Sequence, residues 1–191
     1  MKKILFLALL LVLNYLSAQE LEFYREDLNF EIRENHFLVK GYYYFRNNSP
    51  QLIKRTLFYP FPTSEIYGTI DSLFAFSDST DSRDVLLSQN EKGALFKIEL
   101  EANSEAIYHI GYRQELFAQR AEYILTSTST WGQALQEVNY SLILPKSLQL
   151  LSLSYLPDEL SEQADFYRLQ WHKTDFLPQH DFIVEFRKMG E

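Results

Sequence analysis

The fold is decided by residues 30–62, FEIRENHFLVKGYYYFRNNSPQLIKRTLFYPFP, in which apolar and polar residues alternate. Apolar side chains recur at every second position from Phe30 and again from Phe37, and this period of two places them on one face of an extended chain. Asn, Ser and Pro residues separate the runs, and these residues favour turns. Pro60 and Pro62 end the third run. The pattern predicts a meander of three sequential antiparallel strands.

The second run contains three consecutive tyrosines, which suit a pleated and half-buried surface. Alternation places Tyr43 on the apolar face and therefore in the core. Tyr42 and Tyr44 fall on the opposite face together with Lys40, so we expect their rings to be partly exposed or to lie under a loop. Gly41 inside the run predicts either a bulge or a close neighbour.

The same alternation returns along the rest of the chain, where residues 94–112 read as a hairpin and further runs follow at 138–144, 148–155 and 182–186. Together they predict about ten short strands, spaced roughly 8–12 residues apart, which is typical of two facing sheets. We therefore expect an all-β protein, an antiparallel β-sandwich. One short helix is predicted at residues 131–136, with the Ser and Thr residues of 127–130 as its cap.

The first 18 residues have the pattern of a secretory signal peptide. Lys2 and Lys3 precede ten apolar residues at 4–13, and a small residue, Ala18, stands where cleavage is expected. A membrane helix needs about 20 apolar residues, so no span is expected after cleavage. The predicted organisation is a signal peptide at 1–18, a single β-sandwich domain at 19–191, and export to the periplasm or the extracellular medium.

Composition narrows the classes of partner. Without Lys2 and Lys3, 16 basic residues stand against 26 acidic ones, which is a net charge of −10. Such a charge repels phosphate backbones, so nucleic acid is not an expected partner. The chain contains no cysteine, so its core must hold without disulfide bonds.

Three segments resemble uncharacterised exported bacterial β-sandwich families. They are residues 39–62, with an F-x-N-x-S turn and a Y-P-F-P ending, residues 123–131, YILTSTSTW, and residues 167–186, with a W…F-x-P…F pattern. The resemblance implies an extracytoplasmic β-sandwich. Those families have no established activity, so it assigns no catalytic residue.

Motifs for chemistry are largely missing from the sequence. There is no G-x-S-x-G elbow and no Gly-rich phosphate loop, and His36, His109, His172 and His180 lack the close spacing of zinc ligands. We therefore predict no enzyme activity, no catalytic residues and no cofactor. An acidic loop with Asp78, Asp81 and Asp84 could supply oxygen ligands to calcium, although the Gly and Glu of an EF-hand are missing. The alternative is a solvated surface loop.

The aromatic residues carry the functional hypotheses. Tyr42, Tyr44 and Trp131 are candidates for contact with a ligand or partner, because exposed rings stack on sugars and Tyr and Trp anchor protein interfaces. Trp171 is expected in the core. The preferred hypothesis is a non-enzymatic envelope module that binds another envelope protein or has a structural role. The alternative is a carbohydrate-binding module, and a third hypothesis is a hydrolase with an unrecognised site.

Overall fold

The computed structural model describes residues 20–78 and 85–189. Almost all of the regular structure in these residues is extended, and the prediction of an all-β protein is confirmed. The strands are β1 (Leu21–Arg33), β2 (His36–Asn47), β3 (Ile53–Pro60), β4 (Tyr67–Ser77), β5 (Leu86–Asn90), β6 (Gly93–Leu100), β7 (Glu105–Leu116), β8 (Arg120–Tyr123), β9 (Leu135–Pro145), β10 (Leu148–Leu153), β11 (Glu159–Glu162), β12 (Phe166–Phe176) and β13 (Phe182–Lys188), with a 3-10 helix, η1 (Thr126–Trp131).

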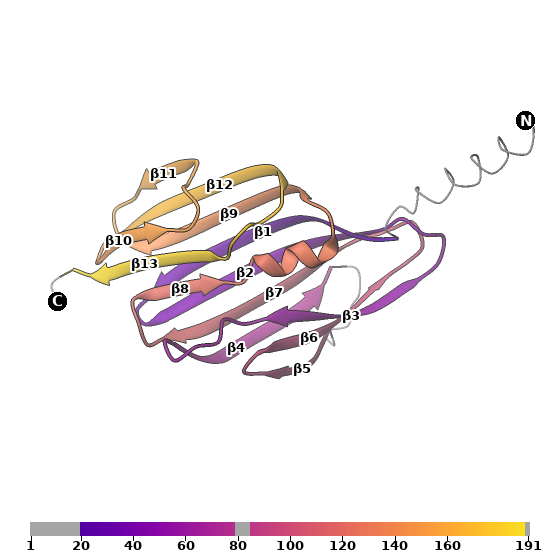
Figure 1. The fold of residues 1–191 in the computed structure, drawn as a ribbon, viewed down its shortest axis with the longest axis horizontal. Coiled ribbons are helices and arrows are strands. Elements are labelled where there is room, and N and C mark those ends of the chain that lie inside the picture. The colour runs from indigo at the N-terminus through magenta and orange to yellow at the C-terminus, as the bar shows by residue number, and fades with distance from the viewer. Residues whose placement is uncertain (1–19, 79–84, 190–191) are drawn as a thin grey trace, which may run out of the picture.

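The strands form three sheets in two layers. One layer is a seven-stranded sheet in the order β11-β12-β9-β1-β2-β7-β4. The other layer consists of two three-stranded sheets, β10-β13-β8 and β3-β6-β5, and η1 lies between them across the same face of the large sheet (Figure 1). The large sheet therefore has one covered face, which holds the core, and one open face.

The expected antiparallel sandwich of about ten strands was wrong in two respects. Thirteen strands lie within the described residues, and the large sheet is mixed, because β1 and β9 run parallel with Leu28 beside Tyr140. Parallel neighbours require a long crossover connection, which here is the whole chain from β2 to η1. Alternating hydrophobicity has the same period in parallel and antiparallel strands, so it does not reveal this pairing.

The predicted meander is correct for its first two strands and wrong for the third. β1 and β2 pair as an antiparallel hairpin from Arg33 and His36, but β3 leaves the large sheet and pairs with β6. The predicted hairpin at 94–112 fails in the same way, because β6 belongs to a small sheet and β7 lies between β2 and β4. The chain changes layer at both places, and alternation carries no information about which layer a strand joins.

One buried asparagine fixes the corner where these layer changes meet. Asn47 ends β2, and its Nδ2 donates to the carbonyl oxygens of Gln51, Leu100 and Glu101 at 2.7, 3.2 and 2.8 Å. Its Oδ1 accepts from the backbone N–H of Ser49 at 2.8 Å. The F-x-N-x-S turn of the sequence is therefore a structural joint between β2, β3 and β6.

The short helix begins five residues earlier than predicted. Thr126–Trp131 form η1, and residues 135–145, which include part of the predicted helix, belong to β9. The Ser and Thr side chains expected to cap a helix lie inside it, where Ser129 Oγ and Thr130 Oγ1 donate to carbonyls three residues earlier. Gly132 ends the helix with a φ of 73°, a left-handed conformation that glycine adopts easily.

The core predictions are confirmed. Tyr43 and Trp171 are buried, and Trp171 packs edge-on against Phe182 with ring centroids 5.2 Å apart. Gly41 has the predicted close neighbour, because the ring of Tyr43 occupies the space that a Cβ would need. No helix within the described residues is long and apolar enough to cross a membrane.

Candidate functional site

One row of side chains crosses the open face of the large sheet. Residues that lie directly opposite one another on paired strands share a face of the sheet. Neighbouring strands lie about 4.8 Å apart, so a row across six strands is about 24 Å long. From β4 to β12 the row consists of Phe76, His109, Tyr42, Asp27, Asn139 and His172.

The first half of the row is aromatic. The rings of Phe76 and His109 are stacked, with centroids 4.4 Å apart and an interplanar angle of 11°, and Tyr42 meets His109 edge-on at 4.8 Å. Phe74 stands beside Phe76 on β4, with its ring over Gly111. Phe74 and Phe76 are 41% and 40% exposed. This half therefore presents apolar ring surface to solvent.

The second half of the row is polar and is held in place by hydrogen bonds. Asp27 accepts from Arg25 Nη2 at 3.0 Å, from Tyr44 Oη at 2.9 Å and from Asn139 Nδ2 at 2.8 Å. His172 Nδ1 lies 2.8 Å from Asn139 Oδ1. The guanidinium of Arg25 lies 4.9 Å above the ring of Tyr44, so one face of that ring is covered.

A hollow of about 660 Å³ lies over the polar half, a size within the range of small-ligand sites. Tyr42 and Tyr44 both line it, together with amide and hydroxyl side chains such as Asn29, Ser141 and Gln170. Partial burial and the bond to Asp27 raise the pKa of Tyr44 to about 12, so its hydroxyl stays neutral and donates. The two tyrosines that the sequence singled out therefore line one hollow.

Trp131, the third predicted contact residue, lies on the other side of the large sheet. Its ring packs against Phe23 and Phe45, with centroids 5.7 and 5.5 Å apart, on the covered face. It lines a separate cavity of about 370 Å³ between η1 and β3. The structure therefore does not bring Trp131 together with Tyr42 and Tyr44.

The cavity between η1 and β3, called the inner cavity from here on, contains a buried acid, Glu26, that the sequence analysis did not single out. Glu26 is only 2% exposed, and it accepts hydrogen bonds from Tyr140 Oη at 2.8 Å and Tyr123 Oη at 3.1 Å. Burial raises its pKa to about 7, against the lowering effect of the two tyrosine bonds. The pairing of β1 with β2 shifts between Phe23 and Arg25, and this bulge reverses the alternation. Alternation counted back from Phe30 places Leu28 and Glu26 on the covered face, so this period is the signal that could have found the acid.

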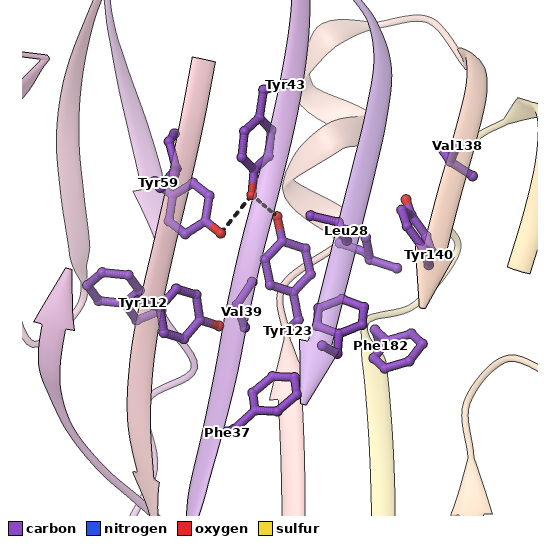
Figure 2. Packing of buried hydrophobic residues seen from close by; sticks show 14 of the residues in the cluster. Leu28, Phe37, Val39, Tyr43, Tyr59, Tyr112, Tyr123, Val138, Tyr140 and Phe182 are labelled. Carbon is purple, nitrogen blue, oxygen red and sulfur yellow. Dashed lines mark hydrogen bonds between the residues drawn. The ribbon is translucent and has the colours of Figure 1, made fainter. Parts of the chain in front are cut away.

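A chain of tyrosine hydroxyls leads to this acid. Tyr43 Oη lies 2.8 Å from Tyr59 Oη and 2.9 Å from Tyr123 Oη, and the three rings converge from β2, β3 and β8 (Figure 2). Because Tyr123 donates to Glu26, it accepts from Tyr43, which in turn accepts from Tyr59. Burial raises the pKa of all three hydroxyls well above the usual value, so these three tyrosines are uncharged.

Of the three aspartates predicted as calcium ligands, Asp78 alone lies within the described residues. Asp78 Oδ1 lies 2.7 Å from His109 Nε2, and Asp81 and Asp84 lie outside the described residues. The other histidines have different neighbours: His36 lies 3.8 Å from Asp71, and the ring of His180 lies 4.1 Å from that of Tyr155. Across residues 20–78 and 85–189, no three His, Asp or Glu side chains are grouped to hold a metal.

The comparisons with known proteins give a fold but no family. No protein-family model and no curated protein matches the chain. The structure is similar to a "putative nutrient binding protein" of Legionella pneumophila, with a TM-score of 0.70 and 11% sequence identity over 87% of this chain and 67% of that one. It is also similar to a "putative protease" of Parabacteroides distasonis, with a TM-score of 0.50 and 9% identity over 89% of this chain.

This chain spans only 41% of the Parabacteroides protein. At identities this low the likeness shows a shared fold alone. Both neighbours are bacterial proteins.

Proposed function

We propose that the protein is an exported, non-enzymatic binding module that recognises a glycan on the open face of its large sheet. The observation that carries the proposal is the single row from Phe76 to His172, which sets aromatic rings and fixed hydrogen-bonding groups side by side across six strands. Export rests on the pattern of residues 1–18, which lie outside the described residues.

The chemistry of the hollow suits a ligand rich in hydroxyl groups. A sugar offers donors and acceptors around a ring together with apolar C–H surface. The hollow supplies carboxylate and amide oxygens from Glu137 and Asn139 and ring surface from Tyr42 and Tyr44. Existing hydrogen bonds already hold many of these groups, which lowers the entropy lost on binding.

The same hydrogen bonds support a binding role rather than a catalytic one. Asp27 accepts from Arg25 Nε and Nη2, from Tyr44 Oη and from Asn139 Nδ2. A carboxylate has about four acceptor positions, so those of Asp27 are filled by neighbouring side chains. Asp27 therefore orients Arg25, Tyr44 and Asn139 around the hollow, which is the part of a scaffold for binding.

A glycan array probed with the purified protein tests the proposal, followed by calorimetric titration with the oligosaccharide that gives the strongest signal. We expect Tyr42→Ala/Tyr44→Ala to weaken binding at least about tenfold. Leu38→Ala is the matched control, because Leu38 lies on the same strand and alternates onto the same face. An array without any saturable binder, or equal affinity for the double variant, would contradict the glycan site.

A protein partner is the second candidate, and the exposed aromatic half of the row favours it. Phe74 and Phe76 lie on β4, the edge strand of the large sheet, and exposed rings of this kind anchor protein interfaces. A pull-down from the native envelope with the protein and with Phe74→Ala/Phe76→Ala distinguishes the two functions. Loss of a partner in this variant, with glycan binding intact, would assign the aromatic half to a protein.

A further inference from the structure

The inner cavity lies on the covered side of the large sheet and is independent of the open face. Its floor is formed by β1 and β2 with Glu26 and Tyr43, and its walls by β3, β6 and the segment from Tyr123 to Trp131. Phe58, which is 56% exposed, and Thr130 lie toward solvent at its rim. The cavity therefore connects solvent with a buried carboxyl group.

Two features of the lining favour a positively charged ligand. Aromatic rings dominate the walls, and the faces of Trp and Tyr rings attract cations. Glu26 receives two hydrogen bonds, from Tyr123 and Tyr140, whereas a carboxylate has about four acceptor positions. Both donors are neutral, so the charge of an ionised Glu26 has no positive partner among them. A buried charge is costly unless it is paired.

We propose that this cavity binds a small organic amine, with the ammonium group paired with Glu26 and the apolar body against the rings of Trp131, Phe45 and Tyr59. An anion would be repelled by Glu26, and a wholly apolar ligand would leave the carboxylate without a counter-charge. The cavity of about 370 Å³ suits a compact amine with one ring or a short alkyl chain.

Trp131 provides a direct readout of occupancy. The chain has two tryptophans. The other, Trp171, lies on β12 and is buried in the core, where it packs against Phe182. In a Trp171→Phe background the fluorescence comes from Trp131 alone. The probes are 2-phenylethylamine, 2-phenylethanol and phenylacetate, which share a ring and a two-carbon skeleton and differ mainly in charge.

At pH 8 we expect 2-phenylethylamine to bind at least about tenfold more tightly than 2-phenylethanol, and phenylacetate not to bind. Glu26→Gln keeps the shape of the side chain and removes its charge, so the amine and the alcohol should then bind alike. Ser127→Phe places a ring in the cavity from η1 and should abolish binding of both. Circular dichroism confirms that each variant is folded.

Affinities measured at several pH values in the Trp171→Phe protein test the role of Glu26 without the Glu26→Gln substitution. Affinity for the amine should rise severalfold between pH 6 and pH 8, as Glu26 ionises, while affinity for the alcohol stays constant. Tyr43, Tyr59, Tyr123 and Tyr140 face Glu26 from the neighbouring strands, and burial holds their pKa values too high for them to titrate in this range.

Three results would overturn the proposal. The first is no saturable fluorescence change with the amine. The second is equal affinity for the amine and the alcohol at pH 8, which would leave Glu26 as a protonated core residue. The third is a preference for the amine that survives both Glu26→Gln and Ser127→Phe, because the amine would then bind elsewhere.

Discussion

Tyr43 Oη lies 2.9 Å from Tyr123 Oη, although Tyr43 belongs to the seven-stranded sheet and Tyr123 to a small sheet that covers it. This hydrogen bond joins the two layers through the core, and it continues to Glu26 on one side and Tyr59 on the other. The same chain of hydroxyls holds the floor of the inner cavity. Stability of the fold and geometry of the cavity are therefore linked.

The bond between Tyr43 and Tyr123 should be measurable as a coupling energy. We expect Tyr43→Phe and Tyr123→Phe each to lower the free energy of unfolding by about 1–2 kcal/mol, because each leaves a buried hydroxyl short of a partner. The double variant should cost less than the sum, with a coupling of about 1 kcal/mol. Urea unfolding measures all three. Tyr42→Phe, on the open face, is the control and should change stability by less than about 0.5 kcal/mol.

The ionisation of Glu26 should lower the free energy of unfolding as pH rises. Its pKa is raised to about 7, so the folded state binds its proton more tightly than the unfolded state. The stabilisation is complete below the unfolded pKa and is lost as pH rises through about 7. Between pH 5 and pH 8 we expect Glu26 to contribute a loss of roughly 2–3 kcal/mol.

Urea unfolding at pH 5 and pH 8 checks this contribution, with Glu26→Gln as the comparison. The variant should lose less stability over this interval than the unsubstituted protein. All other ionisable groups are the same in the two proteins, so the difference between the two slopes reports Glu26. Parallel slopes would show that Glu26 has no raised pKa.

Asn47, which joins β2, β3 and β6, should be among the positions where substitution lowers the free energy of unfolding most. Asn47→Ala removes four hydrogen bonds to backbone groups around a buried site, so we expect a loss of roughly 2–4 kcal/mol in the free energy of unfolding. The adjacent Asn48 is exposed, and within the described residues its side-chain amide bonds only to Glu22, at 3.4 Å. Asn48→Ala should therefore cost less than about 0.5 kcal/mol. Similar losses for Asn47→Ala and Asn48→Ala would contradict the role of Asn47 as a joint between the strands.

Tyr112 offers a site where removal of a polar group should not destabilise the fold. Its hydroxyl is buried and has no hydrogen-bond partner within the described part of the chain. Tyr112→Phe should leave the free energy of unfolding unchanged or raise it by up to about 1 kcal/mol. Tyr140→Phe is the matched comparison, because Tyr140 donates to Glu26, and it should cost about 1–2 kcal/mol. Thermal or urea unfolding distinguishes the two substitutions.

Local alternation was sufficient to predict individual strands and their buried faces. Tyr43 and Trp171 were placed correctly in the core, and Tyr42 and Tyr44 on the opposite face, because side-chain direction in a strand depends only on position along it. Glu26 was missed although it lies in phase with Leu28, Phe30 and Ile32, because a charged side chain is almost never fully buried unless it is paired. The bulge between Phe23 and Arg25 changes the phase of β1 before Glu26, and no Gly in the strand signals it.

By itself, the sequence determined the strand content, the faces of β2 and the turns after it, because these follow from side-chain periodicity and from residues that favour turns. Only the tertiary structure decided which strands pair, since pairing depends on contacts between segments far apart in the chain. It placed β9 parallel to β1, moved β3 and β6 into the covering layer and separated Trp131 from Tyr42 and Tyr44. Both candidate binding sites arise from those long-range pairings, because each is built from side chains of several non-adjacent strands.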